Sequence, residues 1–251
     1  NECGDIIWFN LYGGYGGGVA IDETNDNGVI IAADGRNLLK LDDLGDVEWY
    51  KHYSYSSSGY MTSVVQNSDG GYFSGGTSGQ ILKLDAMGEV IWSATISGDY
   101  VHALDEFPNG DLMYFSWNGS NSSYYIGRVT SQGVLIWENE YIDLAGQSSG
   151  DSHYNWAGEA LIDKSTNHIV VASNTPRNFG DIVVTSIDYN GNVVTSNILG
   201  SAVNTELVRS IDLTDDGGYI IGGATYSYNT SSTSVLTQQP GVPAENLSSR
   251  D

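Results

Sequence analysis

One phrase recurs five times along this chain: a turn rich in Gly, Asn and Asp, a short apolar run and then a few small residues. Its copies begin at Asn25, Asn67, Phe107, Lys164 and Thr214. Self-similarity at a period of tens of residues indicates copies of one supersecondary unit, each too small to bury its apolar face alone. The chain is therefore expected to fold as an array of packed units.

Each unit begins with two strands joined by a tight turn. The first strand carries a small residue followed by an aliphatic one, as in Ala20-Ile21, and the second strand is the recurring phrase itself. Between them stand pairs such as Asn27-Gly28 and Asp69-Gly70. We expect two-residue hairpins there, because Asn-Gly and Asp-Gly supply the positive φ that such turns require.

Two further strands complete the unit. A third strand, as in residues 37–45, ends at another Gly turn, and the fourth strand carries a Trp in three repeats. These residues are Trp49, Trp92 and Trp137, and the fourth repeat has Thr195 instead. Four antiparallel strands joined as a meander describe one blade of a β-propeller.

The two ends of the chain predict how the ring of blades closes. The fifth repeat supplies strands near residues 207–213 and 218–225 but no fourth strand. The chain begins with GDIIWFNLYGG, in which Trp8 takes the place of the fourth-strand Trp residues. We therefore expect an all-β fold: a five-bladed β-propeller of four-stranded antiparallel blades, formed by residues 1–240. The N-terminal strand completes the last blade and leaves no open edge. Residues 241–251 are expected to be a tail or linker.

Three phrases resemble the repeats of secreted bacterial β-propellers: DGGYIIGGAT at Asp216, ILKLDAMGEVIW at Ile81 and NLLKLDDLGDVEW at Asn37. Such repeats are found in surface proteins of marine and gut bacteria, and they are also similar to those of quinoprotein-type propellers. Quinoprotein enzymes carry a cofactor site with calcium ligands and an adjacent disulfide, and this chain, with Cys3 as its single cysteine, does not reproduce that site. The resemblance implies a fold shared with non-catalytic relatives, in which the propeller is a binding or scaffold module of a longer surface protein.

The net charge of the chain limits which kinds of partner it can bind. Nine basic and thirty-one acidic residues give a formal net charge of −22, which repels phosphate backbones and anionic lipid headgroups. Nucleic acid is therefore not expected as a partner, and no segment has the ~18 consecutive apolar residues that membrane insertion needs. The acidity, the few Lys and the many Ser, Thr, Asn and Tyr favour export, and a start at Asn1 is expected if a targeting signal has been removed. We predict a secreted or cell-surface protein.

The longest departure from the repeat is the loop Asp143–Gly158, which contains Asp151, His153, Tyr154 and Trp156. Aromatic side chains stack on the apolar faces of sugar rings while neighbouring polar groups bond the hydroxyls. These four residues are therefore predicted to bind a glycan or protein partner. The alternative is that Trp156 folds under the loop and covers the edge of a blade.

The central channel is a second candidate site. The residue before the small residue of each first strand should lie on one common side, because side chains alternate along a strand. If that side faces the axis, His102, Glu159 and Arg209 form a polar cluster of complementary charge. The alternative is that Glu159 and Arg209, from adjacent blades, merely pair. The five residues at this position are Val19, Thr62, His102, Glu159 and Arg209.

No motif nominates a catalytic centre. The sequence lacks the HExxH, CxxC and P-loop patterns. DETNDNG at residues 22–28 has oxygen side chains at alternate positions but lacks the sixth-position Gly of a calcium loop, so a hairpin turn is favoured. Glycoside hydrolysis needs two carboxylates about 5–10 Å apart, and nothing selects Asp22, Glu106 or Glu159. No catalytic residue and no cofactor are predicted; a structural calcium ion held by channel carbonyls stays open.

Three functions remain. The first is an exported, non-enzymatic propeller module that binds a glycan or protein partner through its loop face, within a larger surface or secreted protein and with a role such as adhesion. The second is a glycan-active hydrolase or lyase with carboxylates in the central pocket. The third is a structural spacer or assembly subunit. Binding without turnover separates the first from the second.

Overall fold

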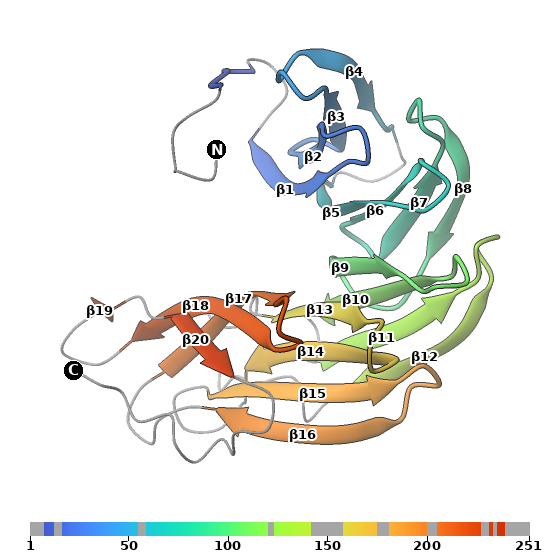
Figure 1. Cartoon of the computed structure of the whole chain (residues 1–251). Coiled ribbons are helices and arrows are strands. Elements are labelled where there is room, and N and C mark those ends of the chain that lie inside the picture. Colours follow the sequence, from blue (N-terminus) through green and yellow to red (C-terminus); the bar gives the residue numbers. More distant parts are fainter. Residues whose placement is uncertain are drawn as a thin grey trace.

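In the computed structural model the chain forms five antiparallel β-sheets that follow one another along an arc (Figure 1). The residues that the structure describes are 8–12, 17–54, 59–119, 123–141, 158–174, 181–199, 205–226, 231–232 and 235–238. These residues include no apolar helix of the length that a bilayer crossing requires.

The first four sheets each have four strands in sequence order. The first sheet comprises β1 (Gly18–Glu23), β2 (Val29–Ala33), β3 (Asn37–Leu41) and β4 (Val47–His52). The second comprises β5 (Met61–Gln66), β6 (Tyr72–Gly76), β7 (Gln80–Leu84) and β8 (Val90–Thr95). The third comprises β9 (Tyr100–Glu106), β10 (Leu112–Asn118), β11 (Ser123–Val129) and β12 (Leu135–Tyr141). The fourth comprises β13 (Gly158–Asp163), β14 (His168–Asn174), β15 (Ile182–Asp188) and β16 (Val193–Leu199).

The fifth sheet is shorter. Its strands are β17 (Thr205–Leu213), β18 (Tyr219–Tyr226), β19 (Ser231–Ser232) and β20 (Val235–Gln238). Both β19 and β20 pair with β18, so together they occupy the third position and, within the described residues, nothing occupies the fourth. This matches the expectation that the fifth repeat lacks a fourth strand.

The first strands of consecutive sheets lie beside one another on the inner side of the arc, and β4, β8, β12 and β16 lie on its outer side (Figure 1). The prediction of all-β, four-stranded antiparallel units is confirmed. The described strands form an open arc, with the first and fifth sheets at its two ends, and not a closed ring (Figure 1). The expected closure is therefore not seen, and the number of blades is not fixed.

The turns between first and second strands differ from the expected two-residue hairpins. In the first sheet Asn27 N donates to Thr24 O at 2.9 Å and Thr24 N donates to Gly28 O at 3.0 Å, which encloses three loop residues. The left-handed residue is the third of these, Asn27 with φ 63°, and Gly70 takes the same place in the second sheet with φ 80°. This is the type I turn followed by a left-handed residue that closes three-residue hairpins. The hairpin reading of DETNDNG is confirmed.

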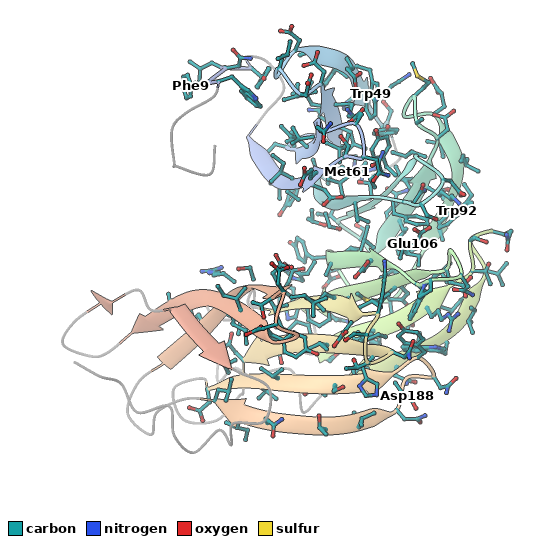
Figure 2. All side chains as sticks on the ribbon, viewed as in Figure 1. Phe9, Trp49, Met61, Trp92, Glu106 and Asp188 are labelled. Atoms are coloured by element: carbon teal, nitrogen blue, oxygen red, sulfur yellow. The ribbon has the colours of Figure 1, made fainter. Side chains whose placement is uncertain are left out.

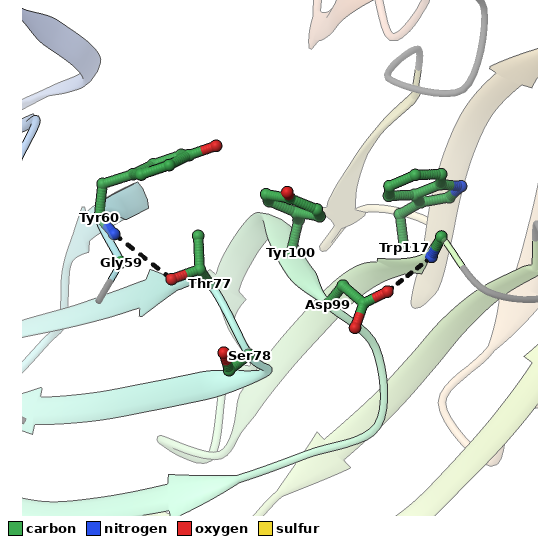
Figure 3. A pocket seen from close by; sticks show the side chains of 8 residues that line it. Gly59, Tyr60, Thr77, Ser78, Asp99, Tyr100 and Trp117 are labelled. Atoms are coloured by element: carbon green, nitrogen blue, oxygen red, sulfur yellow. Dashed lines mark hydrogen bonds between the residues drawn. The ribbon is translucent and has the colours of Figure 1, made fainter. Parts of the chain in front are cut away.

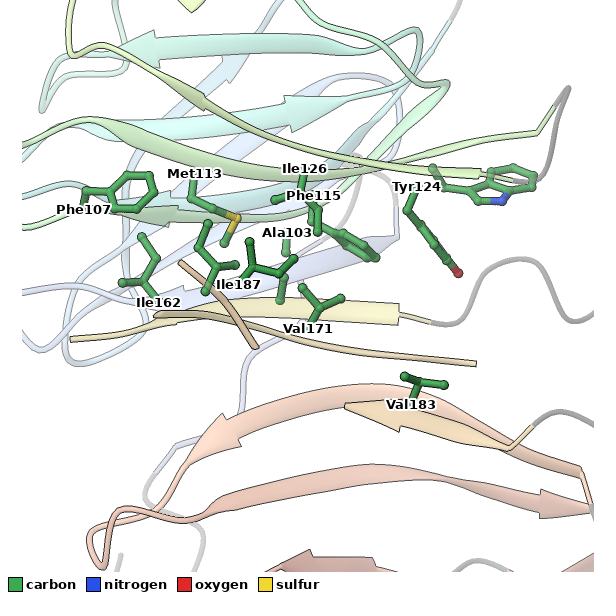
Figure 4. Packing of buried hydrophobic residues seen from close by; sticks show 13 residues of the cluster. Ala103, Phe107, Met113, Phe115, Tyr124, Ile126, Ile162, Val171, Val183 and Ile187 are labelled. Atoms are coloured by element: carbon green, nitrogen blue, oxygen red, sulfur yellow. The ribbon is translucent and has the colours of Figure 1, made fainter. Parts of the chain in front are cut away.

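The core lies between the sheets. Successive residues of a strand point to opposite faces, so Tyr114 packs in a cluster with Phe73 of the second sheet while Phe115 packs with Val171 of the fourth. Figure 4 shows the second of these clusters. Because the second strands of the second, third and fourth sheets are covered on both faces, these strands are buried without alternation.

The predicted fourth-strand Trp residues join each sheet to the next one. Their indole nitrogens donate hydrogen bonds to backbone carbonyls in the turn between the third and fourth strands of the following sheet. Trp49 and Trp92 lie on the outer rim (Figure 2). The bonds are Trp49 to Ala86 at 3.2 Å, Trp92 to Ser131 at 3.0 Å and Trp137 to Tyr189 at 3.0 Å. Thr195 replaces Trp in β16, and no such bond joins the fourth sheet to the described part of the fifth.

Each indole also packs against the Gly of the turn that it reaches. A Cβ on Gly191, which has φ 87°, would lie 3.0 Å from the Trp137 ring. Asn139 Nδ2 and the Tyr141 hydroxyl both donate to Gly191 O at 2.9 Å. Alternate residues of one outer strand therefore all contact one glycine of the next sheet. We call this contact the Trp–Gly latch.

Residues 8–12 make the same latch with the first sheet. A Cβ on Gly45 would lie 2.9 Å from the Trp8 ring, Asn10 Nδ2 donates to Gly45 O at 3.2 Å, and the Tyr12 hydroxyl donates to the same oxygen. Trp8 therefore stands where the other Trp residues stand, as expected from the sequence. Residues 8–12 occupy the position of an outer strand that would precede β1.

Candidate functional site

The structure places His102, Glu159 and Arg209 on the inner strands β9, β13 and β17, as the sequence predicted. Arg209 is exposed. No hydrogen bond or ion pair joins the three side chains to one another within the described residues, so neither the polar cluster nor the Glu159–Arg209 pair is formed.

His102 is half-buried beside an aromatic ring. The centroid of its imidazole lies 6.2 Å from that of Phe115, and its buried Nε2 has no hydrogen-bond partner in the part of the chain that the structure describes. Burial lowers the pKa of His102 to about 4, because desolvation disfavours the charged imidazolium. The ring is therefore neutral at pH 7, with an orphan polar atom.

Glu159 is also desolvated. Burial raises the pKa of its carboxyl to about 7, and a backbone hydrogen bond from Ala160 opposes that shift. The carboxyl is thus near half-protonated at neutral pH. The described residues contain no group of three or more His, Cys, Asp or Glu that could hold a metal ion.

Other carboxylates of the inner strands tie neighbouring sheets together. Asp22 Oδ2 accepts a hydrogen bond from Gln66 N at 2.8 Å. Glu106 accepts from the amide nitrogen of Ser68 at 2.7 Å and from its hydroxyl at 3.0 Å. Asp105 Oδ2 accepts from Ile162 N at 2.7 Å, and burial raises the pKa of that carboxyl. Asp22 and Glu106 therefore serve as links between sheets.

The predicted loop site, formed by Asp151, His153, Tyr154 and Trp156, lies outside the described residues. Its place in the chain is the connection from the outer strand β12 to the next inner strand β13. Two connections of the same kind, residues 53–60 and 96–99, are described at least in part, and both contribute to a pocket.

That pocket lies between the second and third sheets and has a volume of about 580 Å³. Tyr60 and Asp99 come from the segments before β5 and β9, Thr77 and Ser78 follow β6, and Trp117 lies near the end of β10 (Figure 3). An antiparallel bridge between Thr77 and Tyr100 joins the two sheets at this point. The full lining is Gly59, Tyr60, Thr77, Ser78, Asp99, Tyr100, Trp117 and Gly119.

Three aromatic rings form a row along the pocket (Figure 3). The centroids of Tyr60 and Tyr100 are 6.3 Å apart with planes tilted by 42°, and those of Tyr100 and Trp117 are 5.6 Å apart with a tilt of 33°. The two Tyr side chains are half-buried and Trp117 is buried. Burial raises the pKa of Tyr60, and Tyr100 adds to that shift. The row presents aromatic surface from both sheets.

Asp99 brings a fixed carboxylate to the same pocket. Its backbone nitrogen donates to Trp117 O at 2.6 Å, its carbonyl accepts from Ser78 N at 2.6 Å, and Oδ2 accepts from Gly119 N at 2.8 Å. Oδ1 and the Ser78 hydroxyl make no hydrogen bond to the described residues. The pocket therefore combines aromatic faces with an unused acceptor and an unused hydroxyl.

Sequence reasoning missed this pocket, although it held one signal. Tyr60 and Tyr100 stand at the same repeat position, three residues before the small residue of the first strand, and no other repeat has an aromatic residue there. Asp99 and Trp117 gave no such signal, because only the packing of two sheets brings them together.

Comparison with known proteins gives one family and a fold. Residues 23–237 match the family model described as Arylsulfotransferase (ASST). No curated protein matches the sequence.

Many solved structures resemble this one. Kuenenia stuttgartiensis hydrazine synthase has 15% identity and a TM-score of 0.70, over 90% of this chain and 61% of that chain. The WD40 β-propeller domain of Doa1 has 16% identity and a TM-score of 0.62, over 88% and 65%. A protein of unknown function from Bacteroides caccae has 13% identity and a TM-score of 0.55, over 84% and 72%. Identities this low show the β-propeller fold alone. The chain spans about three fifths of the hydrazine synthase chain that it matches.

Proposed function

This chain belongs to the arylsulfotransferase family, and on its β-propeller scaffold we propose an exported, non-enzymatic module that binds a glycan in the pocket between the second and third sheets. The observation that carries the proposal is the row of Tyr60, Tyr100 and Trp117 beside the unused Oδ1 of Asp99. We place this module within a larger secreted or cell-surface protein.

The pocket suits a sugar in size and chemistry. Its volume of about 580 Å³ lies within the roughly 300–1,000 Å³ of ligand pockets. Aromatic faces pack against the apolar C–H face of a pyranose, and a carboxylate oxygen and a hydroxyl bond its hydroxyl groups. Because Asp99 is held by three hydrogen bonds, its carboxylate needs little reordering when a ligand binds.

Charge favours binding over sulfuryl transfer. A transferase must hold an anionic sulfate ester, whereas this chain carries a net charge of −22 and Asp99 lines the pocket. Three cations of the third strands are already engaged by carboxylates. They are Lys40, Lys83 and Arg128.

Titration with neutral oligosaccharides, followed by calorimetry, tests the proposal. Tyr100→Ala should weaken binding by about tenfold or more, since one aromatic contact contributes about 1 kcal/mol beyond its buried area. Tyr50→Ala, on the outer strand β4, is the matched control and should bind like the original protein. Equal affinities for the Tyr100 and Tyr50 variants would remove this pocket as the glycan site.

Sulfuryl transfer is the second candidate, and His102 is the observation that favours it. A neutral imidazole with an unpartnered Nε2 has a free lone pair or a free N–H according to its tautomer, and the former is a nucleophile. Incubation with 4-nitrophenyl sulfate and a phenol acceptor should release no nitrophenolate if the protein only binds. Release that is lost in His102→Gln would overturn the binding module in favour of the transferase.

We also propose that residues 8–12 complete the fifth sheet and close a ring of five blades. Two facts support this closure. Residues 8–12 contact Gly45 in the way that an outer strand contacts the glycine of the following sheet. The fifth sheet lacks an outer strand among the described residues.

A further inference from the structure

We infer that the pocket between the second and third sheets selects a sugar that carries a protonated amine, such as a glucosamine unit, over neutral and anionic sugars. This inference rests on the proposed glycan binding and names its substrate class. It follows from what surrounds the unused oxygen of Asp99.

Among the described residues, the Asp99 carboxylate has no cationic partner. None of the ion pairs among the described residues includes it, and no Lys or Arg lines the pocket. The guanidinium of Arg36 lies beside Gly59, where a Cβ would be 2.7 Å from Nη2, and it donates a hydrogen bond to Gln80 Oε1 at 3.3 Å. A ligand ammonium would therefore be the counter-ion that Asp99 lacks, with a charge-assisted hydrogen bond to Oδ1.

The aromatic row adds a second preference for a cation. An ammonium within about 6 Å of a Tyr or Trp centroid is attracted by the negative face of the ring. The ring centroids of Tyr60 and Tyr100 are 6.3 Å apart, so one ammonium that lies beside the pair can be within about 6 Å of both centroids. Asp34 acts electrostatically on Tyr60 and adds negative potential on that side.

Long-range charge acts in the same direction. A protein of net charge −22 draws cationic ligands toward it and repels uronate or sulfated chains, and salt weakens both effects. Selection of the amine thus depends on local geometry at Asp99 and on a field that screening can reduce.

Three hexasaccharides that share the same β-1,4-linked backbone test the inference. They are chitosan hexamer with free amines, chitin hexamer with acetylated amines, and cellohexaose. Calorimetry at mildly acidic pH should give a chitosan affinity about tenfold above the other two, as expected for one desolvated cation–π contact. Added salt should weaken chitosan binding and leave cellohexaose binding nearly unchanged.

Two variants separate the effect of the Asp99 carboxylate from the effect of the net charge. Asp99→Asn keeps the size of the side chain and should lower chitosan affinity to the level of cellohexaose. Asp43→Asn removes the same charge from an exposed turn and should preserve the preference, which controls for net charge. Circular dichroism checks that both variants are folded.

The outcomes distinguish the inference from the function on which it rests. Equal affinity for chitosan and cellohexaose, or an unchanged preference in Asp99→Asn, overturns the selection of an amine and leaves glycan binding in place. Failure of all three sugars to bind the original protein overturns both.

Discussion

The ammonium of Lys40 lies 2.8 Å from Asp26 Oδ2, and the lysine side chain is only 2% exposed. Lys40 Nζ also bonds Glu48 Oε2 at 2.7 Å. Burial lowers the pKa of Lys40, but the hydrogen bonds to Asp26 and Glu48 outweigh it and leave the pKa raised. The same geometry recurs in the next two sheets, where Lys83 meets Asp69 and Arg128 meets Asp111.

Acid should weaken the Lys40–Asp26 link. Hydrogen bonds from Lys40 and Thr24 lower the pKa of Asp26 to about 2, from 3.8. Because the folded state holds the carboxylate more tightly than the unfolded chain, this stabilisation is present above about pH 4 and is lost as the pH falls toward 2. Asp26→Asn should cost about 1 kcal/mol or less at pH 7, since Asp26 is half-exposed.

Urea unfolding of Asp26→Asn and of the original protein, at neutral pH and near pH 2, measures this difference. The exposed Asp43→Asn is the control and should change nothing at either pH. A destabilisation by Asp26→Asn of the same size at both pH values would show that the ion pair does not stabilise the fold.

Gly191 should tolerate a side chain less well than Gly70. Both have positive φ, 87° and 80°, so Ala strains the backbone at each by about 1 kcal/mol. Only at Gly191 would the new Cβ also meet Asn139 Nδ2 at 2.5 Å and the Trp137 ring at 3.0 Å, whereas Gly70 has nothing within 4 Å. Gly191→Ala should therefore be the more destabilising by about 1–3 kcal/mol in urea unfolding. Equal losses of unfolding free energy in Gly191→Ala and Gly70→Ala would mean that the Trp–Gly latch does not contribute to stability.

Glu159 should make the protein less stable as the pH rises. Its folded-state pKa of about 7 is above the ordinary 4.5, so the folded protein holds a proton that the unfolded chain releases. The stabilisation is present below about pH 4.5 and is lost as the pH rises through 7. We compare the free energy of unfolding of Glu159→Gln with that of the original protein. This difference should be about 2 kcal/mol more favourable to the variant at pH 8 than at pH 5. Chemical unfolding at both pH values tests this, and a constant difference would contradict the raised pKa.

The proposed closure predicts that residues 8–12 lie beside β20. In a Cys3→Ser background, Asn10→Cys paired with Thr237→Cys should form an intramolecular disulfide or short cross-link. Asn10→Cys with Gln132→Cys, at an exposed turn of the third sheet, controls for chance reactivity. Cross-linking of the control pair alone would contradict closure by the N-terminal segment.

The sheets could be predicted from the sequence because the pattern of strands and turns repeats, so that each copy can be aligned with the others. The substitution of Thr195 for Trp also had a visible consequence, since β16 is exposed over nearly its whole length. The turn type was missed because an Asn or Asp before Gly suits both hairpin lengths. At Asn27 the left-handed residue precedes the glycine, and only the hydrogen bonds distinguish the two.

The environment of individual side chains was not predictable in the same way. His102 and Arg209 share a repeat position, but one lies beside Phe115 and the other is exposed. That difference depends on what neighbouring sheets present at each point. For the same reason the residues of the pocket, which come from four separate segments, carried no common pattern.

Within the described residues the Trp–Gly latch joins each sheet to the one that follows it, up to the fourth sheet. The energetics of such an array are close to one-dimensional, a sum of unit terms and nearest-neighbour terms. A gene that gains or loses one copy must restore a single Trp–Gly contact to keep the array intact. Duplication and deletion of whole units are therefore an accessible route by which such chains change length.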